Sequence, residues 1–115
     1  MAKAKTAGMA RQRRKLEAVA YHEAGHAVVC FLRDRPFRYA TIVPDEEFHG
    51  RVMTRKPPKS LQPDSKVDCK ALCWIEREIL AHLAGLAAEY RHAGRHNWRG
   101  ASQDLRNARE LADYL

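Results

Sequence analysis

Two histidines one helical turn apart constrain the fold of this sequence more than any other feature. His22 and His26 flank Glu23 in the segment HEAGH. The surrounding stretch, residues 16–32, has no proline and is rich in Ala, Leu and Glu, which predicts a helix that ends before Pro36. Because four residues make just over one turn, both imidazoles leave the same face of that helix. A fold that uses them must therefore bring other parts of the chain over that face.

The HEAGH segment has the residue types of a zinc site. Two imidazole nitrogens on one face can hold zinc at ~2.0–2.1 Å. The carboxylate of Glu23 can take a proton from a zinc-activated water that attacks a carbonyl group, and can then pass it to the leaving amine. The helix is apolar almost all round, which predicts deep burial. Its apolar residues include Val19, Val28, Val29, Phe31 and Leu32. Two histidines and a glutamate buried there need a common partner, and a metal ion supplies one.

A catalytic zinc usually takes a third protein ligand and keeps one position for water. Val29 and Leu32 stand where the compact HExxHxxGxxH arrangement has its Gly and third His, so the third ligand must come from later in the chain. The candidates are His49, His82, Glu89, His92, His96 and Asp104. Asp104 lies in the first turn of a predicted helix, where the backbone dipole favours a carboxylate. Glu89, on another predicted helix, has a comparable claim, so the residues alone leave the choice open.

A short strand and a return strand are expected after the first helix. Residues 37–43 (FRYATIV) are β-branched and aromatic and end at Pro44, which is typical of a strand. Residues 51–54 can form the returning strand. Residues 55–65 hold three of the five prolines and predict a surface loop.

Two further helices follow in the second half of the chain. Asp64 or Ser65 is expected to cap a long helix that ends at Gly94, and a last helix is expected to start near Ser102. The long helix has an apolar stripe at helical spacing, formed by Leu72, Ile75, Ile79, Leu83 and Leu86. Its stretch of small residues, Ala84, Gly85, Ala87 and Ala88, would let another helix approach closely. The fold class predicted is α+β and mainly helical, with an active-site helix, a short edge strand or hairpin, a long second helix and a third helix.

Charge and cysteine content limit the other functions. Residues 1–15 hold six of the 21 basic groups and none of the 14 acidic ones, which predicts a basic, disordered tail before a domain at 16–115. The remainder is nearly neutral, so nucleic acid is not the favoured partner. Cys30, Cys69 and Cys73 are an odd number and are expected to be reduced thiols. No stretch reaches the ~20 apolar residues of a membrane span and no secretory signal is present, so we expect a cytoplasmic protein.

Four segments, in order, carry a resemblance to a known family. YHEAGHAVV (21–29), YATIVP (39–44), LAGLAAEY (83–90) and GASQDL (100–105) resemble the peptidase domain of FtsH-type ATP-dependent zinc metalloproteases. The resemblance spans about residues 16–115 and is similar to the N-terminal half of that domain. It implies that His22, His26 and Asp104 bind one zinc ion and that Glu23 is the base. It also favours Asp104 over Glu89, which becomes a supporting residue between helices.

The resemblance also implies a substrate and a rival interpretation. The strand residues Tyr39, Ala40, Thr41, Ile42 and Val43 would pair with an extended substrate backbone, adding it as a further strand. No GxxxxGK[ST] segment and no transmembrane segment occur, so we expect a stand-alone or truncated peptidase domain that does not use ATP. Its substrates would be peptides or unfolded protein segments. The alternative is a non-catalytic relative that only binds peptides or regulates, and the oligomeric state is left open.

Overall fold

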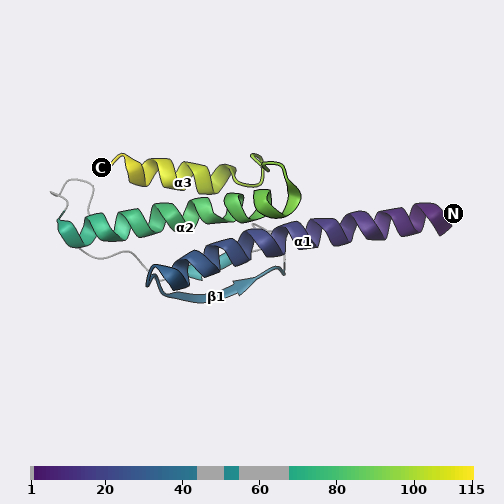
Figure 1. Cartoon of the computed structure of the whole chain (residues 1–115), viewed down its shortest axis with the longest axis horizontal. Helices are drawn as coiled ribbons and strands as arrows, with labels where there is room; N and C mark the ends of the chain where they lie inside the picture. The colour runs from purple at the N-terminus through teal and green to yellow at the C-terminus, as the bar shows by residue number, and fades with distance from the viewer. Residues whose placement is uncertain (1, 44–50, 55–67) are drawn as a thin grey trace.

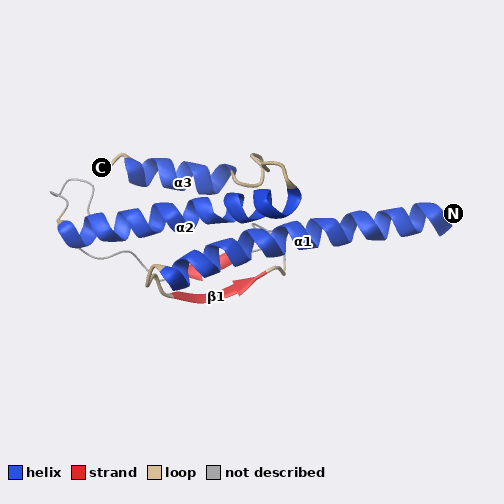
Figure 2. Cartoon of the chain, in the orientation of Figure 1, coloured by secondary structure: helices blue, strands red, loops and turns tan. Residues whose placement is uncertain are grey.

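The computed structural model describes residues 2–43, 51–54 and 68–115. In chain order its elements are α1 (Ala2–Leu32), β1 (Phe37–Thr41), β2 (Arg51–Thr54), α2 (Cys69–Ala93) and α3 (Ser102–Ala112). Figure 1 shows α2 between α1 and α3, with the hairpin on the other side of α1. Helices dominate and the strands form one small sheet (Figure 2), so the prediction of a mainly helical α+β fold is confirmed.

Helix α1 is longer than the sequence predicts. It begins at Ala2, not at Leu16, so the stretch expected to be a disordered tail is helical where the structure describes it. Residues 2–17 are all exposed, and this part of α1 extends beyond the other helices (Figure 1). The reason is local, because Ala, Lys, Arg, Gln and Met are strong helix formers. They add turns to a helix that is already nucleated, so no tertiary contact is needed.

The deep burial predicted for α1 is also wrong. Its buried residues are His22, Glu23, His26 and Cys30, which form one face. Val28, Phe31 and Leu32 are more than half exposed. Because apolar residues lie on every side of α1, the sequence does not indicate which face is buried. Packing against α2 covers only one face. That face is the one carrying the HEAGH side chains.

Helix α2 starts later than expected and ends as expected. Its N-cap is Asp68, whose side chain accepts a hydrogen bond of 2.8 Å from the amide of Ala71. This corrects the predicted cap at Asp64 or Ser65, both of which lie outside the described residues. At the other end Gly94 takes the left-handed conformation, with φ of 76°, and terminates the helix as predicted. No helix among the described residues is long and apolar enough to cross a membrane.

The small residues of α2 allow α1 to approach closely, as the sequence predicts. A Cβ placed on Gly25 of α1 would lie 2.5 Å from the carbonyl oxygen of Ala84 and 2.7 Å from the Cβ of Ala88. Only glycine therefore fits on this side of the contact. Of the predicted apolar stripe on α2, Ile75 is completely buried and Leu86 nearly so, but Leu83 is 39% exposed.

The predicted hairpin is present. β1 pairs antiparallel with β2, with Phe37 opposite Thr54 and Thr41 opposite Arg51, and the register shifts between Phe37 and Tyr39. The strand ends at Thr41, two residues earlier than predicted, and the amide of Val43 turns back to the hydroxyl oxygen of Thr41 at 3.0 Å. The expected loop at 55–65 lies outside the described residues.

Candidate metal centre

Three side chains from two helices converge on one point. His22 and His26 come from α1 and Asp104 comes from the first turn of α3. One donor atom of each lies within 4.8 Å of the others. Oδ2 of Asp104 is 2.9 Å from Nε2 of His22 and 3.2 Å from Nε2 of His26. The structure therefore brings Asp104, and none of the other described third-ligand candidates, into this donor group.

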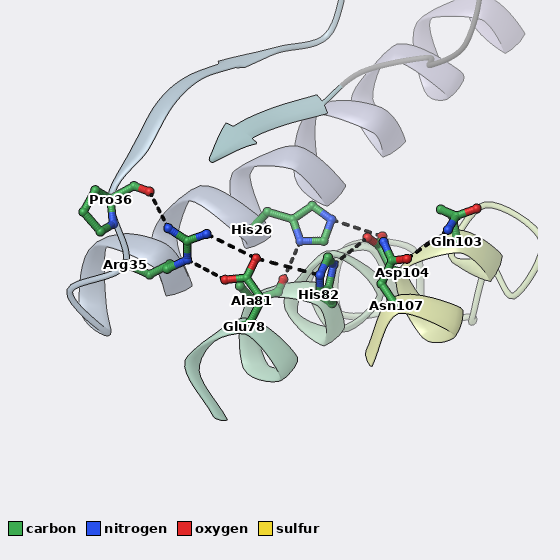
Figure 3. A network of polar contacts seen from close by, with 9 residues as sticks. All are labelled: His26, Arg35, Pro36, Glu78, Ala81, His82, Gln103, Asp104 and Asn107. Carbon is green, nitrogen blue, oxygen red and sulfur yellow. Dashed lines mark hydrogen bonds and ion pairs between the residues drawn. The ribbon is translucent and has the colours of Figure 1, made fainter. Parts of the chain in front are cut away.

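An oxygen atom of α2 lies next to the opposite nitrogen of each histidine ring. Nδ1 of His26 donates to the carbonyl oxygen of Ala81 at 2.5 Å (Figure 3), and Nδ1 of His22 lies 3.3 Å from Oε1 of Glu89. Both acceptors belong to α2, and both favour the tautomer with its proton on Nδ1. Nε2 of each ring then faces Asp104. This is how proteins orient histidines that bind a metal through Nε2.

The donor set suits a divalent cation. Two Nε2 lone pairs and a carboxylate oxygen repel one another at these distances unless a positive charge lies among them. Without a metal, a proton supplies that charge. Burial opposes charge on His26, yet its contacts with Asp104 and with the carbonyl of Ala81 raise its pKa. A metal ion would displace that proton, and two imidazoles with one carboxylate form a set that zinc accepts.

Asp104 is kept ionised by its neighbours. Burial favours the neutral form, but hydrogen bonds from His22, His26 and His82 outweigh it and hold the pKa of Asp104 far below its usual range. The position in the first turn of α3 adds the favourable helix dipole. A carboxylate that stays charged at neutral pH is ready to bind a cation.

Glu23 lies beside the donor group without joining it. Its side chain is buried, and among the described residues Oε2 has no hydrogen-bond partner. Burial raises the pKa of Glu23, although the charges of His26 and His22 act in the opposite direction. A buried carboxylate oxygen without a partner is costly to keep. Its raised pKa suits a group that takes up a proton and then releases it.

Gly85 of α2 lies directly against the donor group. A Cβ at this position would be 2.5 Å from Nε2 of His26 and 2.6 Å from Nε2 of His22. Any side chain there would occupy the space next to the Nε2 atoms of both histidines. The small-residue stretch of α2 thus serves the site as well as the helix packing.

The other candidates for the third ligand lie elsewhere. Glu89 holds His22, and His82 contacts the second carboxylate oxygen of Asp104. The ring of His92 stacks on Tyr21, and that of His96 stacks on the rings of Tyr90 and Trp98. His49 lies outside the described residues.

The predicted substrate strand and two of the three cysteines lie on the surface. Residues 39, 40, 42 and 43 are exposed and residue 41 is partly buried. Cys69 and Cys73 are exposed free thiols and Cys30 is a buried one.

A polar face of α2 was not predicted from the sequence. Glu78, His82, Gly85 and Glu89 follow at spacings of four, three and four residues, which places them on one side of a helix. Glu78, Gly85 and Glu89 are buried and His82 partly so. The spacing is visible in the sequence, but the neighbouring leucine and isoleucine stripe predicts a different buried face.

Comparison with known proteins gives one match. The family model described as Peptidase family M41 matches residues 9–115. No curated protein and no solved structure matches the chain.

Proposed function

Because this chain belongs to peptidase family M41, the family of FtsH peptidase domains, we propose that it is a zinc-dependent endopeptidase. Its substrates would be peptides or unstructured protein segments. The observation that supports this proposal best is the convergence of His22, His26 and Asp104 beside the buried Glu23. Family membership supports a metallopeptidase-type domain in general, and the arrangement of these four residues supports zinc in particular.

In the proposed reaction each residue has a separate task. His22, His26 and Asp104 would hold zinc, which supplies a Lewis acid that makes a water molecule acidic and polarises a carbonyl group. Glu23 would remove a proton from the attacking water and deliver it to the amine that leaves. Its buried position raises its affinity for that proton, and the nearby His22 and His26 limit the rise.

We propose that β1 binds the substrate. β1 pairs with β2 along one edge, and it packs next to α1, which carries the histidines. An extended peptide could add to β1 by main-chain hydrogen bonds. Tyr39, Ala40, Thr41, Ile42 and Val43 would contact that peptide. The given sequence has no GxxxxGK[ST] segment, the glycine-rich loop that holds nucleotide phosphates.

A paired measurement of metal content and cleavage tests this function. We expect the purified chain to contain close to one equivalent of zinc and to cleave unstructured casein, and a chelator to stop cleavage until zinc is restored. Glu23→Gln should keep the zinc and lose cleavage by at least ~100-fold, since general base catalysis contributes about 10²–10⁴-fold.

The outcomes separate this function from its alternative. A wild-type chain without zinc after exposure to the metal would refute the proposal. A chain that holds zinc and binds peptides without cleaving them would instead support the non-catalytic alternative. Equal cleavage by wild type and Glu23→Gln would refute the role of Glu23.

A further inference from the structure

A chain of polar contacts joins the metal centre to the far end of α1 (Figure 3). It starts at Asp104 on α3, passes through His82 and Glu78 on α2, and ends at Arg35 just after α1. Of these residues only Asp104 belongs to the donor group. The proposed chemistry leaves the other three without a task.

The contact between His82 and Asp104 has a defined direction. Nδ1 of His82 lies 3.4 Å from Oδ1 of Asp104. An ionised carboxylate can only accept, so the proton of this hydrogen bond belongs to His82. The two carboxylate oxygens of Asp104 therefore have different partners. Oδ1 faces His82, and Oδ2 faces His22 and His26. His82 thus restricts rotation of the carboxylate about its last torsion.

A carboxylate lies near the other ring nitrogen of His82. Oε1 of Glu78 lies 4.0 Å from Nε2 of His82, one turn away on α2. Glu78 is held in turn by Arg35, with Nε of Arg35 2.5 Å from Oε2 of Glu78. Arg35 is 5% exposed and Glu78 is 7% exposed, and the guanidinium also lies over the ring of Trp74 at 5.4 Å. A buried ion pair of this kind has little freedom to rearrange.

We propose that His82 is a positioning residue for Asp104. The inference rests on the proposed function, because it treats Asp104 as a metal ligand. His82 acts through Asp104 only, since it lies on the oxygen that points away from the histidine pair. Removing its donor frees the carboxylate to rotate, and loss of such a support typically weakens metal binding by about 10–100-fold.

Three substitutions at His82 test the proposal. His82→Asn keeps an N–H donor near the place of Nδ1, whereas His82→Gln moves the donor outward and His82→Leu removes it. His96→Leu is the matched control, because it makes the same change at an exposed histidine outside the chain of polar contacts. Zinc affinity is measured by competition with a chromophoric chelator, and the visible absorption of the cobalt-loaded protein reports the ligand geometry.

We expect His82→Leu and His82→Gln to bind zinc about 10–100-fold more weakly and to alter the cobalt spectrum. His82→Asn should remain within about threefold of wild type, and His96→Leu should match wild type. Should His82→Leu fail to fold, the comparison of His82→Asn with His82→Gln still tests whether the position of the donor matters.

Equal zinc affinity and equal cobalt spectra in all His82 variants would overturn the proposal while leaving the proposed peptidase intact. A wild-type chain that takes up no zinc would overturn both. Weaker zinc binding in His82→Leu from a chain that cleaves no substrate would support the positioning role and refute the peptidase.

Discussion

Replacing Gly85 with alanine should remove zinc binding while leaving the helices in place. The added methyl carbon would lie 2.5–2.6 Å from the Nε2 atoms of His26 and His22, where ordinary contact needs at least 3.4 Å. The rings would have to retreat by about 1 Å, and interiors packed like crystals do not absorb such a shift freely. A retreat would break the hydrogen bond of His26 to Ala81 and would move His22 away from Glu89.

The size of the effect follows from the tolerance of such sites. A metal site must be held within about 0.5 Å, and a displacement of about 1 Å costs roughly 100-fold. We therefore expect zinc affinity to fall at least ~100-fold, equivalent to about 2.8 kcal/mol. The stability of the metal-free protein should change less. Alanine gains about 1 kcal/mol in a helix and overpacking costs about 1–3 kcal/mol.

Zinc affinity and thermal unfolding, measured on metal-free protein, separate these two effects. Gly8→Ala is the matched control, because a Cβ there meets nothing within 4 Å and the position is an exposed turn of α1. It should leave zinc binding unchanged. If Gly85→Ala binds zinc as tightly as Gly8→Ala, the two ring nitrogens do not face α2 as the structure has them, and the reasoning is wrong.

Two further outcomes check the surroundings of the site. Glu89→Ala removes the carboxylate next to Nδ1 of His22, so zinc affinity, measured by chelator competition, should fall about 10–100-fold. Glu89→Gln keeps an oxygen at this place and should lose less affinity. A wild-type affinity in Glu89→Ala would contradict the orienting role of Glu89. Burial raises the pKa of the Cys30 thiol, so it stays protonated to higher pH and reacts slowly. In a thiol assay at pH 8 the exposed Cys69 and Cys73 should react at once and Cys30 only after denaturation. Three fast thiols would contradict the burial of Cys30.

Capping residues in the sequence predicted two helix ends correctly. Gly94 ends α2 because it can adopt a positive φ, and Ser102 begins α3. The predicted start of α2 failed because several capping residues compete in that stretch, and the choice of Asp68 depends on where α2 must pack. The predicted start of α1 was wrong because the prediction relied on charge. Charge suggested disorder in residues 2–15, but helix propensity decides the conformation of a segment whose residues are all exposed.

The hydrophobic pattern identified the buried surfaces only in part, since Ile75 and Leu86 are buried as predicted. In α1 the apolar residues surround the helix, so the pattern contained no information about the face that packs on α2. In α2 the leucine and isoleucine stripe was visible, but Glu78 and Glu89 are more deeply buried than Leu83. Charged residues are buried there because each has a partner on another element, and a single-helix pattern cannot show a partner.

What the sequence by itself determined is that His22 and His26 share one helix face, since one helical turn separates them in any helix. What only the tertiary structure decided is which carboxylate oxygen lies next to their Nε2 atoms. Asp104 and Glu89 were equivalent on local grounds, and both do reach the histidines. The packing of α1 on α2 puts Glu89 behind His22 at Nδ1, and α3 on the other side of α2 brings Asp104 to the two Nε2 atoms. A ligand distant in sequence is selected by the relative placement of helices, and local spacing does not encode that placement.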